Sequence, residues 1–148
     1  LYPKTKFYTL AAVNSCKGKY RDSAPVCKGN RGMVAVAANG NLYPCHQMSG
    51  YYEQHGCFLG NVKKTPLKEL LSGGNYLEEV CTTLRTLKEN NRKCGSCAYF
   101  ELCNGGCRAI ALALTGDRLG IDPSKCFFWE NGYAGKIAAA LPDYETNI

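Results

Sequence analysis

The chain has 148 residues, 45% of them hydrophobic, which is enough for one domain with a buried core. Its formal charge is +6, but the 18 lysines and arginines include no run of five, so we expect no nucleic-acid partner. No stretch of 18 apolar residues occurs, which argues against a membrane-spanning helix. The 10 cysteines are far more than an average chain of this length carries.

The first part of the chain predicts a β-hairpin followed by a loop. Residues 1–26 show no clear pattern and are expected to be a lead-in segment. Between Met33 and Cys45, apolar residues flank Asn39-Gly40, the strongest short signal for a hairpin, so we expect Cys45 at the end of the second strand. Residues 47–61 contain three glycines and are expected to form a loop.

Helices are predicted after this loop. Thr65-Pro66 is typical of a helix N-terminus, and leucines at 67, 70 and 71 would give that helix one apolar face before Gly73-Gly74 ends it. A second helix is expected from Asn75 to Asn91, because its apolar residues keep helical spacing.

Two more helices are predicted in the last third of the chain. One runs from Cys107 to Gly116, and the other begins at Pro123 after the capping residue Asp122, with glycines at 132 and 135 as possible breaks. The second of them supplies the expected core anchors Phe127, Phe128 and Trp129. The predicted fold class is therefore α+β, a small hairpin followed by short helices and metal-binding loops.

Four thiols lie within fourteen residues, from Cys94 to Cys107, at the spacing C-x2-C-x5-C-x3-C. Thiolates select zinc, Cu(I) or iron–sulfur clusters, so this run predicts a metal site. The spacing is similar to the C-x2-C-x2-C-x3-C run of bacterial ferredoxins, whose fourth cysteine binds the other cluster. By that analogy Cys94, Cys97 and Cys103 would share one cluster, and Cys107 would reach another.

Spacing alone leaves three interpretations of the cysteines open. A zinc site would use the pairs at 94/97 and 103/107, and five disulfides would suit a secreted domain. The third interpretation is two four-iron clusters, which would need eight ligands, and eight cysteines are suitably placed: Cys16, Cys27, Cys45, Cys94, Cys97, Cys103, Cys107 and Cys126. The other two cysteines, Cys57 and Cys81, are expected to pack as small hydrophobes in the core.

The whole pattern resembles the SPASM domain, the C-terminal extension of many radical SAM enzymes. The seven-cysteine signature of that family matches residues 27–126, including Gly40, which is separated from Cys45 by four residues. The neighbouring residues are also similar to the family: Gly-Asn-Leu-Tyr-Pro-Cys ending at Cys45, Leu59-Gly60-Asn61, and Gly105-Gly106-Cys107-Arg108.

The resemblance implies two [4Fe-4S] clusters. Two such clusters need eight ligands, and the eighth lies outside the seven-cysteine signature. Cys16 is favoured for that position, and Cys57, Asp22 or an open iron are the alternatives. Residues 27–148 would form the SPASM domain, and residues 1–26 would lead in from an upstream radical SAM barrel. Cluster I would be bound by Cys16, Cys27, Cys45 and Cys107, and cluster II by Cys94, Cys97, Cys103 and Cys126.

The resemblance also implies a function. The C-x3-C-x2-C triplet of radical SAM catalysis does not occur in this sequence, so S-adenosylmethionine is expected only in an upstream domain, and whether this chain is itself an enzyme stays open. The expected role is electron transfer and active-site closure in a cytoplasmic maturase that modifies a peptide or protein. The alternative is a structural module, stapled by zinc or clusters, that binds a peptide or partner without redox activity.

Overall fold

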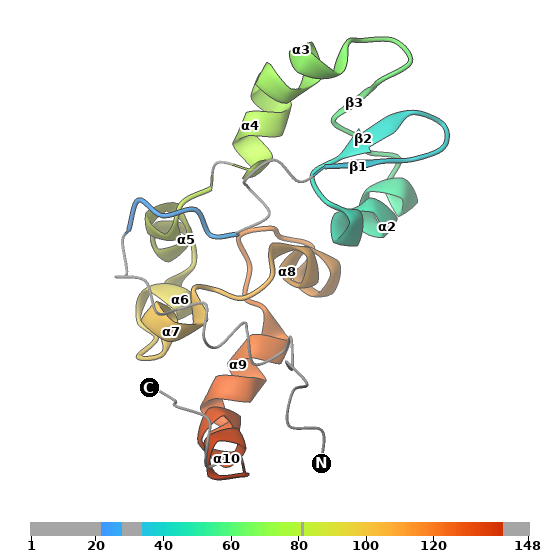
Figure 1. Ribbon diagram of the computed structural model, residues 1–148. Coiled ribbons are helices and arrows are strands. Elements are labelled where there is room, and N and C mark those ends of the chain that lie inside the picture. The colour runs from blue at the N-terminus through green and yellow to red at the C-terminus, as the bar shows by residue number, and fades with distance from the viewer. Residues whose placement is uncertain (1–21, 28–33, 81, 141–148) are drawn as a thin grey trace.

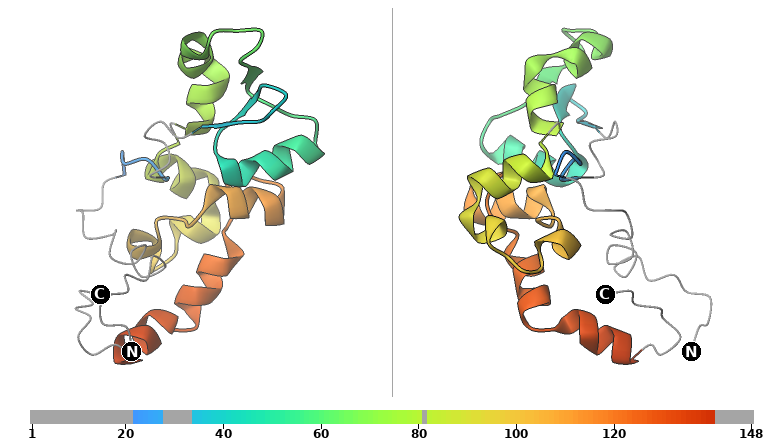
Figure 2. Two further views of the ribbon diagram at one scale, coloured as in Figure 1. Left: turned by 45° about the vertical axis from the view of Figure 1, so that its right-hand side comes forward. Right: turned by 90° about the vertical axis from the view of Figure 1, so that its left-hand side faces the viewer.

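The computed structural model describes residues 22–27, 34–80 and 82–140 (Figure 1). A small antiparallel sheet with α2, α3 and α4 forms one end of the molecule. Helices α5 to α8 lie in the middle, and α9 and α10 extend away from the sheet, as the two further views in Figure 2 also show. This mixed architecture confirms the predicted α+β class. None of the described helices is long and apolar enough to cross a membrane.

The sheet has the order β1-β2-β3, with β1 at Ala35–Val36, β2 at Asn41–Tyr43 and β3 at Gly60–Asn61. The predicted hairpin turn at Asn39-Gly40 is confirmed: Gly40 has a φ of +93°, and the Asn39 side chain accepts a hydrogen bond from the Asn41 N–H at 2.9 Å. β2 ends just before Pro44, which cannot donate to a strand partner. Cys45 therefore follows the central, buried strand of the sheet, as expected.

The predicted loop over residues 47–61 is wrong. These residues form α2 (His46–Gln54) and then β3, which pairs with β2. Met48 is buried in α2 and packs with Ala109 and Leu112 of α8 (Arg108–Thr115). Most of the stability of a short helix comes from tertiary packing of this kind, which overrides the weak local preference of a glycine-containing segment.

The single helix predicted over 75–91 is instead two helices, α4 (Gly74–Val80) and α5 (Leu84–Asn90). Just before α5, the backbone is extended at Thr83 and pairs with the segment before Cys27: the Val26 N–H donates to the Thr82 carbonyl at 3.0 Å, and the Leu84 N–H donates to the Ala24 carbonyl at 2.9 Å. A continuous helix would have used these backbone groups internally, so the break is what anchors residues 24–26.

The helix α3 (Leu67–Ser72) begins one residue later than predicted, with Pro66 as its N-cap, and it has no buried residue. The chain continues through two very short helices, α6 (Arg92–Gly95) and α7 (Phe100–Cys103), before α8. The predicted end of α8 at Gly116 is confirmed, with a left-handed φ of +71° at that glycine.

The predicted start of α9 (Pro123–Glu130) after Asp122 is confirmed, because the Asp122 side chain accepts a hydrogen bond from the Lys125 N–H. Trp129 is buried as predicted, but Phe127 is 59% exposed, so its assignment to the core is wrong. α9 ends before Gly132, whereas α10 (Tyr133–Ala140) runs through Gly135.

Candidate metal centres

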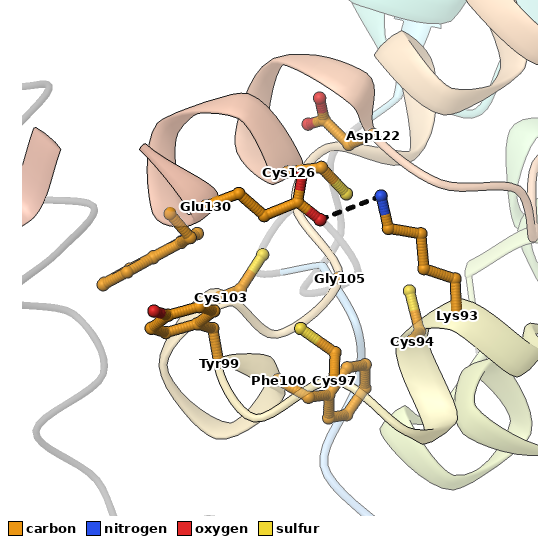
Figure 3. Close-up of a pocket in the computed structure, with 11 residues that line it drawn as sticks. Lys93, Cys94, Cys97, Tyr99, Phe100, Cys103, Gly105, Asp122, Cys126 and Glu130 are labelled. Carbon is orange, nitrogen blue, oxygen red and sulfur yellow. Dashed lines mark ion pairs between the residues drawn. The ribbon is translucent and has the colours of Figure 1, made fainter. Parts of the chain in front are cut away.

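Four predicted ligands line one pocket between α6, α7 and α9. Figure 3 shows the sulfur atoms of Cys94, Cys97, Cys103 and Cys126 facing a common space. Tyr99, Phe100 and Trp129 supply apolar walls. An ion pair of 2.9 Å between Lys93 and Glu130 joins α6 to α9 beside the thiols (Figure 3). The structure thus brings together the set assigned to cluster II by resemblance.

Local capping places these thiols. The Asn91 carboxamide oxygen accepts a hydrogen bond from the Cys94 N–H at 3.0 Å, and its amide group donates to the Leu119 carbonyl at 2.8 Å. This one side chain therefore starts α6 and ties it to the loop before α9. Cys126 lies in the first turn of α9, which Asp122 caps, and its N–H donates to the Asp122 carbonyl at 3.0 Å.

Burial favours the neutral form of three of the pocket thiols when no cation is bound. It is the largest cause of a raised pKa at Cys94 and Cys126, and it raises the pKa of Cys103 from 9.0 to about 11. The neighbouring thiolates of Cys94 and Cys126 add to the shift at Cys103. Such thiols become thiolates when a metal centre compensates their charge, and binding then releases protons.

A left-handed turn sends Cys107 away from this pocket. Asn104, Gly105 and Gly106 have successive φ values of 54°, 77° and 72°. A Cβ on Gly105 would overlap a Leu87 methyl carbon, and one on Gly106 would lie 2.5 Å from the Asp122 carboxylate. Only glycine, which has no Cβ, allows both the left-handed φ and the close contact at these two positions. The turn explains how Cys103 and Cys107, four residues apart, join different groups.

A second group of thiols contains Cys27, Cys45 and Cys107. Cys45 and Cys107 are the N-cap residues of α2 and α8, and both pack against the core that these two helices share. Burial raises the pKa of Cys45, and negative charge on Cys107 and Cys27 raises it further, as expected for neighbouring thiols. Cys27 directly follows the anchored segment 24–26.

The N-termini of α2 and α8 favour anions at this second group. Backbone N–H groups of Gln47 and Met48 hydrogen-bond to Cys45 and oppose the rise of its pKa. The positive ends of two helix dipoles act in the same direction. The Cys107 thiol donates to the Gln47 side-chain oxygen at 3.2 Å.

The remaining sequence-predicted positions have different outcomes. Cys57 is exposed and lines a separate hollow with Tyr43 and Phe58, so its assignment to the core is wrong. The Asp22 carboxylate lies 3.7 Å from Lys88 Nζ. Cys16 and Cys81 lie outside the described residues. No disulfide joins the cysteines of the described ranges to one another.

Two buried side chains between the thiol groups were not among the predicted site residues. Asp122 is 2% exposed, and its second carboxylate oxygen accepts a hydrogen bond from the Cys107 N–H at 2.8 Å. Arg108 is 4% exposed. The Asp-Pro pair indicated a helix cap but no contact with Cys107, and the sequence carried no signal for the burial of Arg108.

Comparison with known proteins shows the family to which this part of the chain belongs. Residues 27–98 match the SPASM family, described as an iron–sulfur cluster-binding domain. These residues are a SPASM domain. The match contains Cys27, Cys45, Cys94 and Cys97 and ends before Cys103. A SPASM domain binds iron–sulfur clusters, so the donor set of the pocket, four cysteine thiols, fits the family.

Several curated proteins are similar to this chain over part of their own length. An AdoMet-dependent heme synthase of Nitratidesulfovibrio vulgaris is 34% identical over 66% of this chain and 23% of its own. A pre-heme d1 synthase of Dinoroseobacter shibae is 37% identical over 65% of this chain and 22% of its own. A cysteine-type anaerobic sulfatase-maturating enzyme of Clostridium perfringens is 32% identical over 49% and 18%. The chain thus spans under a quarter of these relatives, and no solved structure matches it.

Proposed function

We propose that this SPASM domain binds two [4Fe-4S] clusters and serves as the auxiliary-cluster part of a radical SAM enzyme. The observation that carries the proposal is the pocket in which Cys94, Cys97, Cys103 and Cys126 face one space. Cys27, Cys45 and Cys107 would bind the other cluster. Its fourth ligand is proposed to be Cys16, with Asp22 or an open iron as the alternatives. Cys57 fits that position poorly, because it is exposed in a separate hollow.

The spread of the thiols favours a cluster over a single zinc ion. Four thiolates around zinc all lie about 2.3 Å from one point. Within the described part of the chain, no three histidine, cysteine or acidic side chains converge closely enough to hold one ion. Each iron of a [4Fe-4S] cluster binds its own cysteine. Thiols that surround a space without converging on one point fit that arrangement better.

When bound, the clusters would pass electrons to or from the reaction in the rest of the enzyme. The chain's own contribution is to hold them apart in a partly apolar setting. Trp129 is buried against the pocket and stacks on Tyr99, with ring centroids 6.0 Å apart, which limits the access of water. Burial and hydrogen bonds to sulfur are the factors by which a protein adjusts cluster potentials.

We propose that the partner of this domain is a radical SAM barrel that binds S-adenosylmethionine, and that the enzyme works in the cytoplasm. The proposed substrate is a peptide or protein, which the similarity to a sulfatase-maturating enzyme supports. A second candidate is the substrate of a heme synthase, since the heme synthases match a longer part of the chain at higher identity. Product analysis of the intact, reduced enzyme with both substrate classes separates them.

The cluster proposal is tested by iron and sulfide analysis of the anaerobically purified intact protein. Changing Cys94, Cys97, Cys103 or Cys126 to alanine should remove about four irons per chain relative to wild type and leave the other auxiliary cluster. The matched control is Cys57→Ala, which removes an exposed thiol and should leave the iron content unchanged. Stoichiometric zinc in a colourless protein, or equal iron loss in Cys57→Ala, would refute the proposal.

A module that only binds a peptide or partner makes a different prediction. Its clusters would be structural, so loss of one would weaken binding in proportion to unfolding, without a separate effect on electron flow. Single-turnover product formation in Cys126→Ala, measured beside substrate affinity, distinguishes the two. Retained affinity with lost turnover supports the electron-transfer role.

A further inference from the structure

A buried arginine lies close to both groups of thiols. Arg108 is the first residue of α8, directly after Cys107. Its guanidinium donates hydrogen bonds to the carbonyls of Arg118 (3.0 Å) and Gly120 (2.8 Å), and to that of Gly105. Its buried Nε–H has no acceptor in the described structure. The side chain is therefore fixed by neutral carbonyls, and its Nε–H is left without an acceptor among the described residues.

The groups that act on this guanidinium when they are ionised come from both thiol groups. Cys94 and Cys103 of the pocket and Cys107 of the second group all interact electrostatically with Arg108, as does the buried Asp122. The ion pairs found among the described residues do not include Arg108. A buried cation is costly unless anionic groups compensate it. Cysteine-bound clusters on both sides would supply that compensation.

We propose that Arg108 is a positioning residue that acts as the shared counter-charge of the two clusters and raises both of their reduction potentials. The inference rests on the proposed function and deepens it. One-electron reduction makes a thiolate-bound cluster more anionic, so a nearby buried cation stabilises the reduced form. The Nε–H would donate a hydrogen bond to a sulfur atom of a cluster or of its cysteine ligand. Such a bond also stabilises the reduced cluster and so raises its reduction potential.

The test is a redox titration of the intact protein with dithionite as the electron donor, followed by electron paramagnetic resonance. Variants Cys94→Ala and Cys45→Ala first assign the two auxiliary-cluster signals. Arg108→Gln removes the charge, and Arg108→Lys keeps it. In Arg108→Gln both clusters should take up an electron at least tenfold less favourably, a fall in each midpoint of about 59 mV. Arg108→Lys should stay near the wild-type values.

Arg118→Gln is the matched control. Arg118 lies in the loop that accepts the Arg108 hydrogen bonds, but its own charge is neutralised by Glu79 at 2.8 Å. Its removal should leave both midpoints unchanged. A shift at one cluster only, no shift, or equal shifts in the glutamine and lysine variants would overturn the inference. Wild-type protein without the iron of two auxiliary clusters would instead overturn the proposed function.

Discussion

Replacing Asp122 with alanine should destabilise the domain more than any comparable surface change. Its carboxylate is almost completely buried and accepts two backbone hydrogen bonds, from the Lys125 N–H at 3.1 Å and the Cys107 N–H at 2.8 Å. Loss of a helix cap costs about 1 kcal/mol. A buried N–H left without an acceptor costs a further ~1–3 kcal/mol. The expected loss of unfolding free energy is therefore about 2–4 kcal/mol.

The assay is guanidinium unfolding of the reduced, metal-free chain, followed by the fluorescence of Trp129, the single tryptophan. Iron release from the loaded protein to a chelator gives a second measurement, and both clusters should release iron faster, because Asp122 holds Cys107 and the helix that carries Cys126. Asp117→Ala is the control: this exposed carboxylate accepts one hydrogen bond, from the Leu119 N–H at 2.8 Å. Equal effects of the two variants would refute the reasoning.

Burial and backbone geometry lead to three further predictions. The pKa of Cys103 is raised to about 11, so the folded state favours the neutral thiol. The free energy of unfolding of the metal-free chain should therefore be highest below pH 9 and fall by on the order of 2 kcal/mol as the pH rises to about 11. Denaturant titrations at several pH values measure this fall. Gly106→Ala should reduce the iron content, because its Cβ would lie 2.5 Å from the Asp122 carboxylate at a left-handed φ; wild-type iron would contradict the proposed turn. Trp129→Ala should lower the free energy of unfolding by about 3–5 kcal/mol and expose the pocket to oxygen, so that the cluster absorbance bleaches faster in air. Phe127→Ala is the control, because its side chain is 59% exposed, and it should change the bleaching rate little.

The spacing of the cysteines predicted a thiolate metal site, and the resemblance to the SPASM family was needed to choose iron–sulfur clusters over zinc or disulfides. Ligand type is a local property, since a thiol binds soft metals wherever the fold places it. The same holds for the hairpin turn at Asn39-Gly40 and the start of α9 after Asp122, because turn and cap preferences act within four residues. These features were therefore readable from neighbouring residues alone.

The errors lie where distant segments decide the outcome. α2 forms because Met48 packs on α8, and α4 ends where the backbone pairs with residues 24–26. Neither partner is visible in the local pattern of hydrophobic residues. Cys57 has the same neighbours in sequence as a core residue would have, yet the fold leaves it exposed.

The amino-acid sequence by itself determined which atoms are available as ligands and where the chain can turn. Only the tertiary structure decided which sulfurs face one another, because Cys94, Cys97 and Cys103 meet Cys126 through helix packing. It also decided that Arg108 and Asp122 are buried between the two groups of thiols. The physical reason is that burial and charge compensation depend on contacts between segments far apart in the chain, whereas the spacing of residues in the sequence predicts only contacts between near neighbours.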